Sequence, residues 1–270
     1  MNMKQRGLLE NQQGVRENIS PITADVEEEV LIMSENSVVL GDCMELLPSI
    51  KSESIDLIAT DPPYEINFEN NDWDRDNSLD WNSLAKEFFR ALKPAGTLIL
   101  FQGWSSVMNT HSYLEKYFTL KNWIIYDRIK GRGAKTNLVS TREDILWYVK
   151  NSKEYTYNKV SSTIPKKTGG TIGRKNGNKY RALSNVWTDV SPIVPWSKER
   201  VQHPTQKPLF LMDRIVSIFS NEDDIVLDPF AGSGTTAIAS IQKNRRYMCF
   251  ENNEEYFEII RRRIESLKNE

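Results

Sequence analysis

The sequence has few of the residues that build disulfide frameworks or metal sites. Its 270 residues include two cysteines, Cys43 and Cys249, and two histidines. Cysteines so far apart in the sequence provide neither a disulfide framework nor the close spacing of a zinc site. We therefore expect no bound metal and a reducing compartment, the cytoplasm.

Long apolar runs are also missing. No stretch approaches the roughly 18 consecutive apolar residues that a membrane-spanning helix needs, and residues 1–18 lack the apolar region of a secretory signal. Residues 1–34 are polar and without clear periodicity, which predicts a loosely ordered N-terminal arm. With 39% hydrophobic residues, the chain is long enough for one large α/β domain or two small ones.

The small net charge hides an asymmetry along the chain. Residues 128–181 contain 14 Lys and Arg but three Asp and Glu, a net of +11, so the remaining residues carry −13 in a chain whose total is −2. A basic block in an otherwise acidic chain indicates a surface for a polyanion such as nucleic acid. The alternative is a solvated charged loop region.

Strand and helix patterns alternate after the arm. Apolar runs predict strands at 38–40, 55–60, 95–103, 122–129, 144–150, 225–228 and 246–251. Helical periodicity is found at 43–50, 79–93, 105–117, 208–219, 235–243 and 254–268. Such alternation predicts an α/β fold, with a doubly wound, mostly parallel sheet and helices on both faces. Residues 151–200, rich in Lys, Asn, Gly, Ser and Thr, are expected to form an insertion or small subdomain outside the sheet.

A glycine-rich turn follows the predicted strand at 225–228. Gly232, Gly234 and Ala237 fit the pattern G-x-G-x-x-A, in which glycine lets a ligand approach the backbone and the helix N-terminus offers free N–H groups. Glu251 lies 23 residues after Asp228, where a carboxylate can accept both hydroxyl protons of a ribose. These features predict an adenosine-containing cofactor. The alternative is a tight turn that needs glycine for packing.

S-Adenosylmethionine (SAM) fits this turn better than a dinucleotide. A dinucleotide enzyme normally builds two nucleotide-binding halves after its glycine turn, and here 33 residues follow Ala237. SAM carries no phosphate and needs the turn, an acid for its ribose and polar groups for its methionine end.

The tetrapeptide Asp61-Pro62-Pro63-Tyr64 follows the predicted strand at 55–60. The two prolines fix the carbonyl of Pro62 and the carboxylate of Asp61 in a rigid pair of acceptors. Such a pair suits an exocyclic amine, whose nitrogen attacks a sulfonium methyl group without a nucleophilic side chain. Tyr64 would stack on a base that has left the helix. The alternative is a strand-ending turn capped by an aspartate.

Three motifs in order carry a family resemblance. TDPPY at 60–64, HPTQKP at 203–208 and DPFAGSGTT at 228–236 resemble the β class of amino-group DNA methyltransferases, over roughly residues 37–268. The resemblance implies a circularly permuted, Rossmann-like fold for a SAM-dependent methyltransferase domain at 35–270. Its implied parts are a catalytic half at 35–127, a target-recognition region at about 128–200 and a cofactor-binding half at 201–270.

The family also implies roles for single residues. Asp61, Pro62, Pro63 and Tyr64 would form the amine-methylating site. Glu251 would hold the ribose, Asp42 would face the adenine, and His203 with its neighbours would lie near the methionine end. The full cofactor set is Asp42, His203, Thr205, Gln206, Lys207, Asp228, Phe230, Gly232, Gly234, Thr235 and Glu251. The candidate phosphate contacts in the basic block are Arg128, Lys130, Arg132, Lys135, Lys166, Lys167, Arg174 and Lys175.

Three tryptophans and the two cysteines lie outside the three motifs. Trp73 is expected either to close over the flipped base or to pack in its loop. For Trp187 and Trp196 we expect core packing of the recognition region. The sequence contains no Pro-Cys dipeptide, the nucleophile motif of carbon-5 cytosine enzymes, so Cys43 and Cys249 are expected in the core.

A tetrapeptide that begins with Asp is typical of adenine-N6 enzymes in this class. We therefore expect a site-specific adenine-N6 DNA methyltransferase that flips its base out of duplex DNA and transfers the methyl group in line. The alternatives are a cytosine-N4 enzyme, an RNA or protein amino methyltransferase, and a degenerate DNA-binding regulator. The resemblance suggests two protein partners, a second copy of the chain and a cognate restriction endonuclease of a restriction–modification system.

Overall fold

A computed structural model describes residues 34–64, 79–132, 136, 138–165 and 179–268. These residues belong to one compact unit, Leu31–Glu270. The predicted arm at 1–34 lies outside the described residues except for Ser34. Among the residues that the structure describes, no helix is long and apolar enough to cross a membrane.

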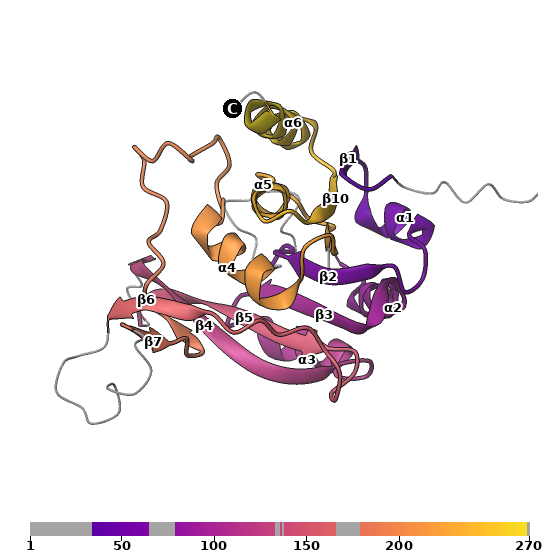
Figure 1. The fold of residues 1–270 in the computed structure, drawn as a ribbon, viewed down its shortest axis with the longest axis horizontal. Helices are drawn as coiled ribbons and strands as arrows, with labels where there is room; N and C mark the ends of the chain where they lie inside the picture. Colours follow the sequence, from indigo (N-terminus) through magenta and orange to yellow (C-terminus); the bar gives the residue numbers. More distant parts are fainter. Residues whose placement is uncertain (1–33, 65–78, 133–135, 137, 166–178, 269–270) are drawn as a thin grey trace, which may run out of the picture. The chain divides into compact units, whose positions relative to one another are not determined.

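Strands and helices alternate along most of the chain (Figure 1). The strands are β1 Ser37–Leu40, β2 Ile55–Thr60, β3 Leu92–Gln102, β4 Thr119–Arg132, β5 Ser140–Val149, β6 Ser161–Pro165, β7 Tyr180–Ala182, β8 Val186–Trp187, β9 Ile225–Asp228 and β10 Arg246–Glu251. The helices are α1 Cys43–Leu46, which continues into a 3₁₀ turn at Leu47–Ser49, α2 Trp81–Ala91, α3 Val107–Leu114, α4 Leu209–Phe219, α5 Thr235–Gln242 and α6 Glu254–Lys268.

The main sheet has eight strands in the order β1-β10-β9-β2-β3-β5-β4-β8. Strands β1, β10, β9, β2 and β3 are parallel, while β5 is antiparallel to both β3 and β4. Segments far apart in the sequence therefore lie side by side, with β9 and β10 between β1 and β2. Because β5 runs the other way, its first residues lie at the edge where the parallel strands end.

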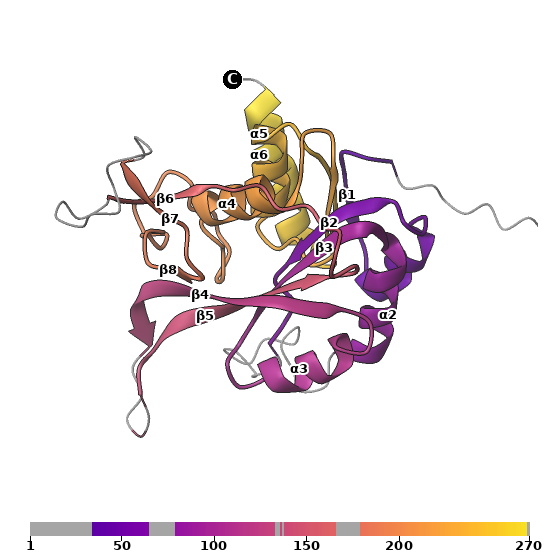
Figure 2. The same ribbon diagram turned by 60° about the horizontal axis from the view of Figure 1, so that its bottom comes forward.

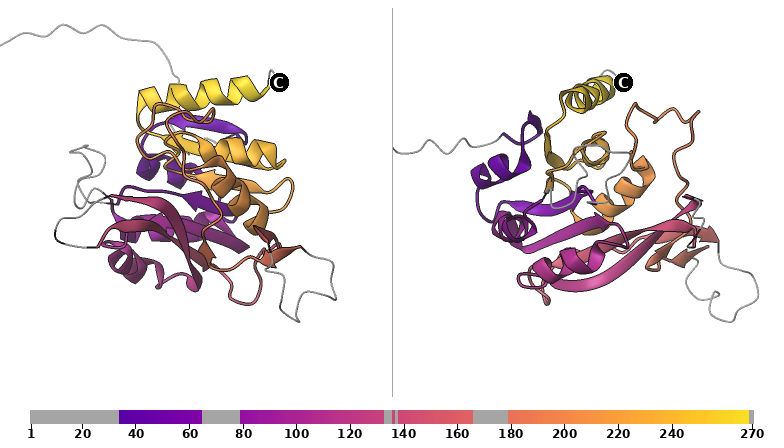
Figure 3. Two further views of the ribbon diagram at one scale, coloured as in Figure 1. Left: turned by 90° about the vertical axis from the view of Figure 1, so that its left-hand side faces the viewer. Right: turned by 180° about the vertical axis from the view of Figure 1, so that it is seen from behind.

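Helices cover both faces of this sheet (Figure 2). Met248 and Phe250 of β10 pack with α1 and α2 on one face, and Tyr247 and Cys249 pack with α5 and α6 on the other. This alternation follows from the two-residue period of a strand and explains why strands buried on both faces are continuously apolar. Figure 3 shows α6 at the β1 end of the sheet, opposite the end formed by β4 and β5. Cys43 and Cys249 are buried, as predicted.

Helix α2 is shorter than the predicted range of 79–93. It begins after Asp80, whose carboxylate accepts the N–H groups of Asn82 and Ser83. It ends at Ala91 because Leu92 already pairs with Ile55 of β2. The pairing with β2 therefore starts β3 three residues before the predicted strand at 95–103.

The prediction that residues 151–200 lie outside the sheet is wrong in part. Strands β6 and β7 form a separate two-stranded sheet, but β8 pairs with β4 in the main sheet. The side chain of Trp187 is buried with α4 residues in one core cluster. Trp196 is 80% exposed, so the expected core packing is confirmed for Trp187 and wrong for Trp196.

Candidate active site

A cavity of about 730 Å³ opens at the edge where the parallel strands end. Loops after β1, β2, β3, β9 and β10 line it, together with the start of β5 and the segment 203–208. Ligands bind at this edge in open α/β sheets. All four residues of the tetrapeptide at 61–64 line the cavity, as do ten of the eleven residues in the predicted cofactor set.

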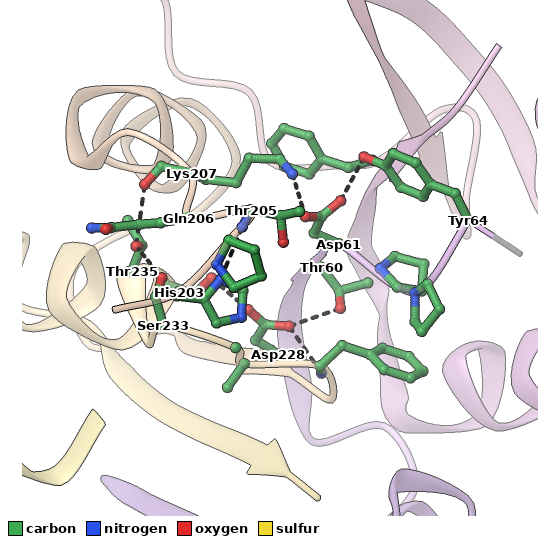
Figure 4. A pocket seen from close by; sticks show the side chains of 18 of the residues that line it. Thr60, Asp61, Tyr64, His203, Thr205, Gln206, Lys207, Asp228, Ser233 and Thr235 are labelled. Carbon is green, nitrogen blue, oxygen red and sulfur yellow. Dashed lines mark hydrogen bonds and ion pairs between the residues drawn. The ribbon is translucent and has the colours of Figure 1, made fainter. Parts of the chain in front are cut away.

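Asp61 is held by a tyrosine and a lysine from different parts of the chain (Figure 4). The hydroxyl of Tyr64 donates a hydrogen bond of 2.6 Å to Oδ1 of Asp61. The ammonium group of Lys207 forms an ion pair with Oδ2. The sequence predicts Lys207 near the methionine end of the cofactor. Its ion pair with Asp61 of the tetrapeptide was not predicted.

The protonation states of this group follow from burial and charge. Burial acts to lower the pKa of Lys207, but the carboxylates of Asp61 and Glu143 outweigh it and raise that pKa above its ordinary value. Burial, followed by the charge of Asp61, raises the pKa of Tyr64. Lys207 is therefore an ammonium ion and Tyr64 a neutral hydrogen-bond donor at neutral pH.

Glu143, which was not among the predicted site residues, extends the charged group. Its Oε2 lies 3.5 Å from Nζ of Lys207, and its Oε1 lies 3.5 Å from Nη1 of Arg128. Arg128 also donates to the backbone oxygen of Ser140 at 3.2 Å. The direction of β5 brings Glu143 here, and an apolar run does not reveal its own direction in a sheet.

Asp228 joins the two halves of the site. Its Oδ1 accepts from Thr60 at the end of β2 at 2.7 Å and from the N–H of Phe230 at 3.1 Å. Its Oδ2 accepts from Thr236 at 2.6 Å. The strand that delivers Asp61 is thus fixed to the glycine turn by a buried carboxylate.

Two glycines of the turn occupy positions where a side chain would be strained or would clash. Gly232 and Gly234 have φ of +52° and +76°, where a side chain is disfavoured. A Cβ on Gly234 would lie 2.7 Å from Cγ2 of Ile260, and one on Gly232 would lie 2.9 Å from Nε2 of His203. Gly234 caps α5 and is the one member of the predicted cofactor set that does not line the cavity.

Glu251 and the 203–208 segment form the rest of the wall. Glu251 accepts the N–H groups of Gly232 at 2.7 Å and Asn253 at 2.9 Å. The side-chain amide of Gln206 bonds the backbone of Glu199 and Val201, so it fixes its own loop. Asp42 lines the cavity and caps α1 through the N–H of Met44, while Thr235 donates to the backbone oxygen of Lys207 at 3.2 Å.

Comparison with known proteins decides the family. A family model described as DNA methylase, of the N6/N4 type, matches residues 55–262. The chain belongs to this family of DNA methylases.

Relatives of the methylase are similar over most of its length. The type II methyltransferase M.HpaI of Haemophilus parainfluenzae is 32% identical over 243 residues, 86% of this chain and 75% of the relative. The DNA adenine methyltransferase YhdJ of Escherichia coli (strain K12) is 36% identical over 244 residues, 85% of this chain and 82% of the relative. The crystal structure of an M1.HpyAVI–SAM complex matches with a TM-score of 0.61 and 29% identity, over 84% of this chain and 98% of that one.

These similarities confirm the predicted family, the Rossmann-like α/β methyltransferase fold, SAM as the cofactor and methyltransferase activity.

The cavity wall of the methylase fits SAM. Each oxygen of Glu251 accepts one backbone N–H and keeps a lone pair for a ribose hydroxyl. Burial lowers the pKa of His203 to about 4, so its ring is neutral at pH 7 and does not repel a sulfonium cation. When bound, SAM supplies an electrophilic methyl group.

The predicted phosphate contacts are described in part. The side chain of Arg128 is 30% exposed and lines the cavity with Glu143. Two arginines that were not predicted, Arg142 and Arg200, also line the cavity and are exposed. The structure does not describe Trp73, nor the side chains of the other predicted contacts Lys130, Arg132, Lys135, Lys166, Lys167, Arg174 and Lys175.

Two buried groups of the cavity make opposite contributions to the pH dependence of stability. Burial raises the pKa of Asp228 from 3.8 to about 6, so its contribution to the free energy of unfolding falls as pH rises through that window. Burial lowers the pKa of His203 from 6.5 to about 4, so its contribution is complete above pH 6.5 and is lost as pH falls toward 4. Each shift corresponds to about 3 kcal/mol. Between about pH 4 and pH 6 the two contributions to the free energy of unfolding change in opposite directions and nearly cancel.

We therefore expect His203→Asn to change the shape of the stability profile. The difference in free energy of unfolding between the wild type and this variant should grow by up to about 3 kcal/mol from pH 4 to pH 6.5. Urea unfolding at several pH values measures this difference. The contributions of the carboxyl groups cancel in it because both proteins contain them. Parallel profiles would contradict the lowered pKa of His203.

Proposed function

We propose that this methylase transfers the methyl group of SAM to the exocyclic N6 amine of adenine in duplex DNA. The observation that carries the proposal is the position of Asp61 and its two prolines in the same cavity as the glycine turn and Glu251. The relative YhdJ, named as a DNA adenine methyltransferase, supports adenine as the base.

In this proposal Asp61 and the carbonyl of Pro62 accept the two N–H groups of the target amine. Accepting both hydrogens favours a pyramidal nitrogen whose lone pair can attack. The N–C bond would form as the C–S bond of SAM breaks, with S-adenosylhomocysteine as the leaving group, and the proton of the methylated nitrogen would pass to solvent water. Tyr64 presents its ring to the flipped base, and its hydrogen bond to Asp61 fixes the tilt of that ring. Flipping requires roughly a few kcal/mol of unstacking, which contacts in the pocket offset.

Nucleoside mass spectrometry tests the base and the position together. DNA is taken from a methylation-free host that expresses the chain, beside a host that expresses Asp61→Ala. We expect N6-methyladenine in the wild-type sample and none in the variant sample. N4-Methylcytosine would keep the chemistry and overturn the base, and N6-methyladenine in both samples would overturn the role of Asp61. A homodimer and a cognate restriction endonuclease stay predictions.

A further inference from the structure

In the arrangement described above, Asp61 is a weakened hydrogen-bond acceptor for the target amine. Tyr64 bonds one of its oxygens and Lys207 pairs with the other. A carboxylate offers about four acceptor positions, so there is room for an amine. The adjacent ammonium charge nevertheless reduces the electron density that Asp61 offers, which makes it a weaker acceptor.

Lys207 has a second carboxylate within reach. Oε2 of Glu143 lies 3.5 Å from Nζ of Lys207, longer than a strong charge-assisted hydrogen bond. Both side chains are largely buried, with 11% of Lys207 and 13% of Glu143 exposed. One buried ammonium group is therefore shared unequally by two carboxylates, and a small movement would transfer it from Asp61 to Glu143.

Arg128 decides how strongly Glu143 attracts that lysine. Its Nη1 lies 3.5 Å from Oε1 of Glu143, and this positive charge competes with Lys207 for the same carboxylate. The Nε of Arg128 is buried and has no hydrogen-bond partner within the described part of the chain. Its guanidinium group lies near the end of β4, where the basic block begins, so a DNA phosphate can bind it in a bidentate contact.

We propose that Glu143 is a positioning residue that controls which carboxylate holds Lys207. When Arg128 leaves Glu143 for a phosphate of bound DNA, Glu143 takes Lys207 and frees Asp61 to accept from the target amine. DNA binding is thereby coupled to the acceptor strength of Asp61. The proposal rests on the proposed role of Asp61 as the acceptor for the amine.

The test measures the rate of methyl transfer under single turnover, with both DNA and SAM saturating. Glu143→Gln keeps the size of the side chain but leaves Lys207 on Asp61. We expect the saturating rate to fall at least about tenfold, the scale of one charge-assisted hydrogen bond in the transition state, with unchanged affinity for SAM. Arg128→Gln should weaken DNA binding, and its saturating rate should fall much less than that of Glu143→Gln, because Glu143 is then always free to take Lys207.

A double variant tests whether Arg128 acts on the rate through Glu143 or independently of it. In the Glu143→Gln background, Arg128→Gln should not change the saturating rate further. The proposal is overturned if Glu143→Gln stays within about twofold of the wild type, if it weakens SAM binding, or if Arg128→Gln lowers the saturating rate as much as Glu143→Gln does.

Two controls keep the test interpretable. Asp213→Asn removes a partly buried carboxylate that pairs with Lys243 outside the cavity and should leave the rate unchanged. If Glu143→Gln fails to fold, Glu143→Asp keeps the charge with a shorter reach and should give an intermediate rate. Tritium transferred from SAM counts methylation of either base, so an error in the proposed base does not affect the result. Failure of Asp61 as the acceptor appears instead in Asp61 variants.

Discussion

Asp61→Asn should lower the single-turnover rate of methyl transfer by about 10²–10³, the range found when one preorganised polar group is removed from an active site. The variant keeps the volume of the side chain but loses its charge and one acceptor. Its amide N–H₂ group would face the ammonium of Lys207, donor against donor, so Lys207 would move to Glu143. The target amine would then lose a charged acceptor at the moment its nitrogen becomes positive.

Affinity for SAM should change by no more than about threefold, because the residues that fit its ribose lie in the other half of the site. Equilibrium dialysis gives the affinity, and tritium transfer to a duplex containing the target gives the rate. Asp56→Asn is a matched control: Asp56 is the second residue of the same strand, pairs with Lys93 at 2.8 Å and accepts the N–H of Ile225. It should reduce stability without changing the rate. Full activity of Asp61→Asn would refute the assigned role.

Three strands that are buried on both faces and one amphipathic helix could be predicted from the sequence to the residue. The runs at 55–60, 225–228 and 246–251 and the helix at 254–268 agree with β2, β9, β10 and α6. Their backbone hydrogen bonds and apolar side chains point to the same structure, so local pattern and tertiary packing do not compete. The residues directly after these strands, Asp61 and the glycine turn, could be placed at the cavity for the same reason.

The remaining parts of the site depend on contacts between segments far apart in the sequence. Strand β8 has two residues, too few for a periodic pattern, and it forms because β4 offers an edge. Glu143 reaches the cavity through the antiparallel direction of β5, which no local pattern encodes. Lys207 could be assigned to the site by its motif, but its partner Asp61 lies 146 residues away. Pairings of this kind require the folded structure.

Asp189→Asn should lower the free energy of unfolding by about 3–5 kcal/mol, the usual effect of breaking a buried ion pair. Asp189 and Arg214 form a two-bond fork with both distances 2.8 Å, and their side chains are 6% and 4% exposed. The guanidinium lies between the rings of Trp187 and Phe210, 5.1 and 4.9 Å from their centroids. Without Asp189, a buried cation would lose its counter-ion.

The lowered pKa of Asp189 reflects the hydrogen bonds that stabilise its charged form. Burial acts to raise it, but the hydrogen bonds from Arg214 and Thr163 outweigh burial and hold the pKa far below the ordinary value. Both the N–H and the hydroxyl of Thr163 donate to Oδ2 of Asp189 at 2.8 Å. Through these bonds one carboxylate ties β6 of the small sheet and α4 of the main unit to the segment after β8.

Removing the other partner should destabilise the protein less. Arg214→Met leaves Asp189 with the two donors of Thr163 and places an apolar side chain between Trp187 and Phe210, where it remains well packed. Glu258→Gln is the control, since its partner Arg261 is 52% exposed and exposed pairs contribute about 0–1 kcal/mol. Urea unfolding of the three variants should rank them Asp189→Asn, Arg214→Met and Glu258→Gln, from most to least destabilised. Equal losses of unfolding free energy for Asp189→Asn and Glu258→Gln would show that the buried ion pair of Asp189 and Arg214 does not hold these segments together.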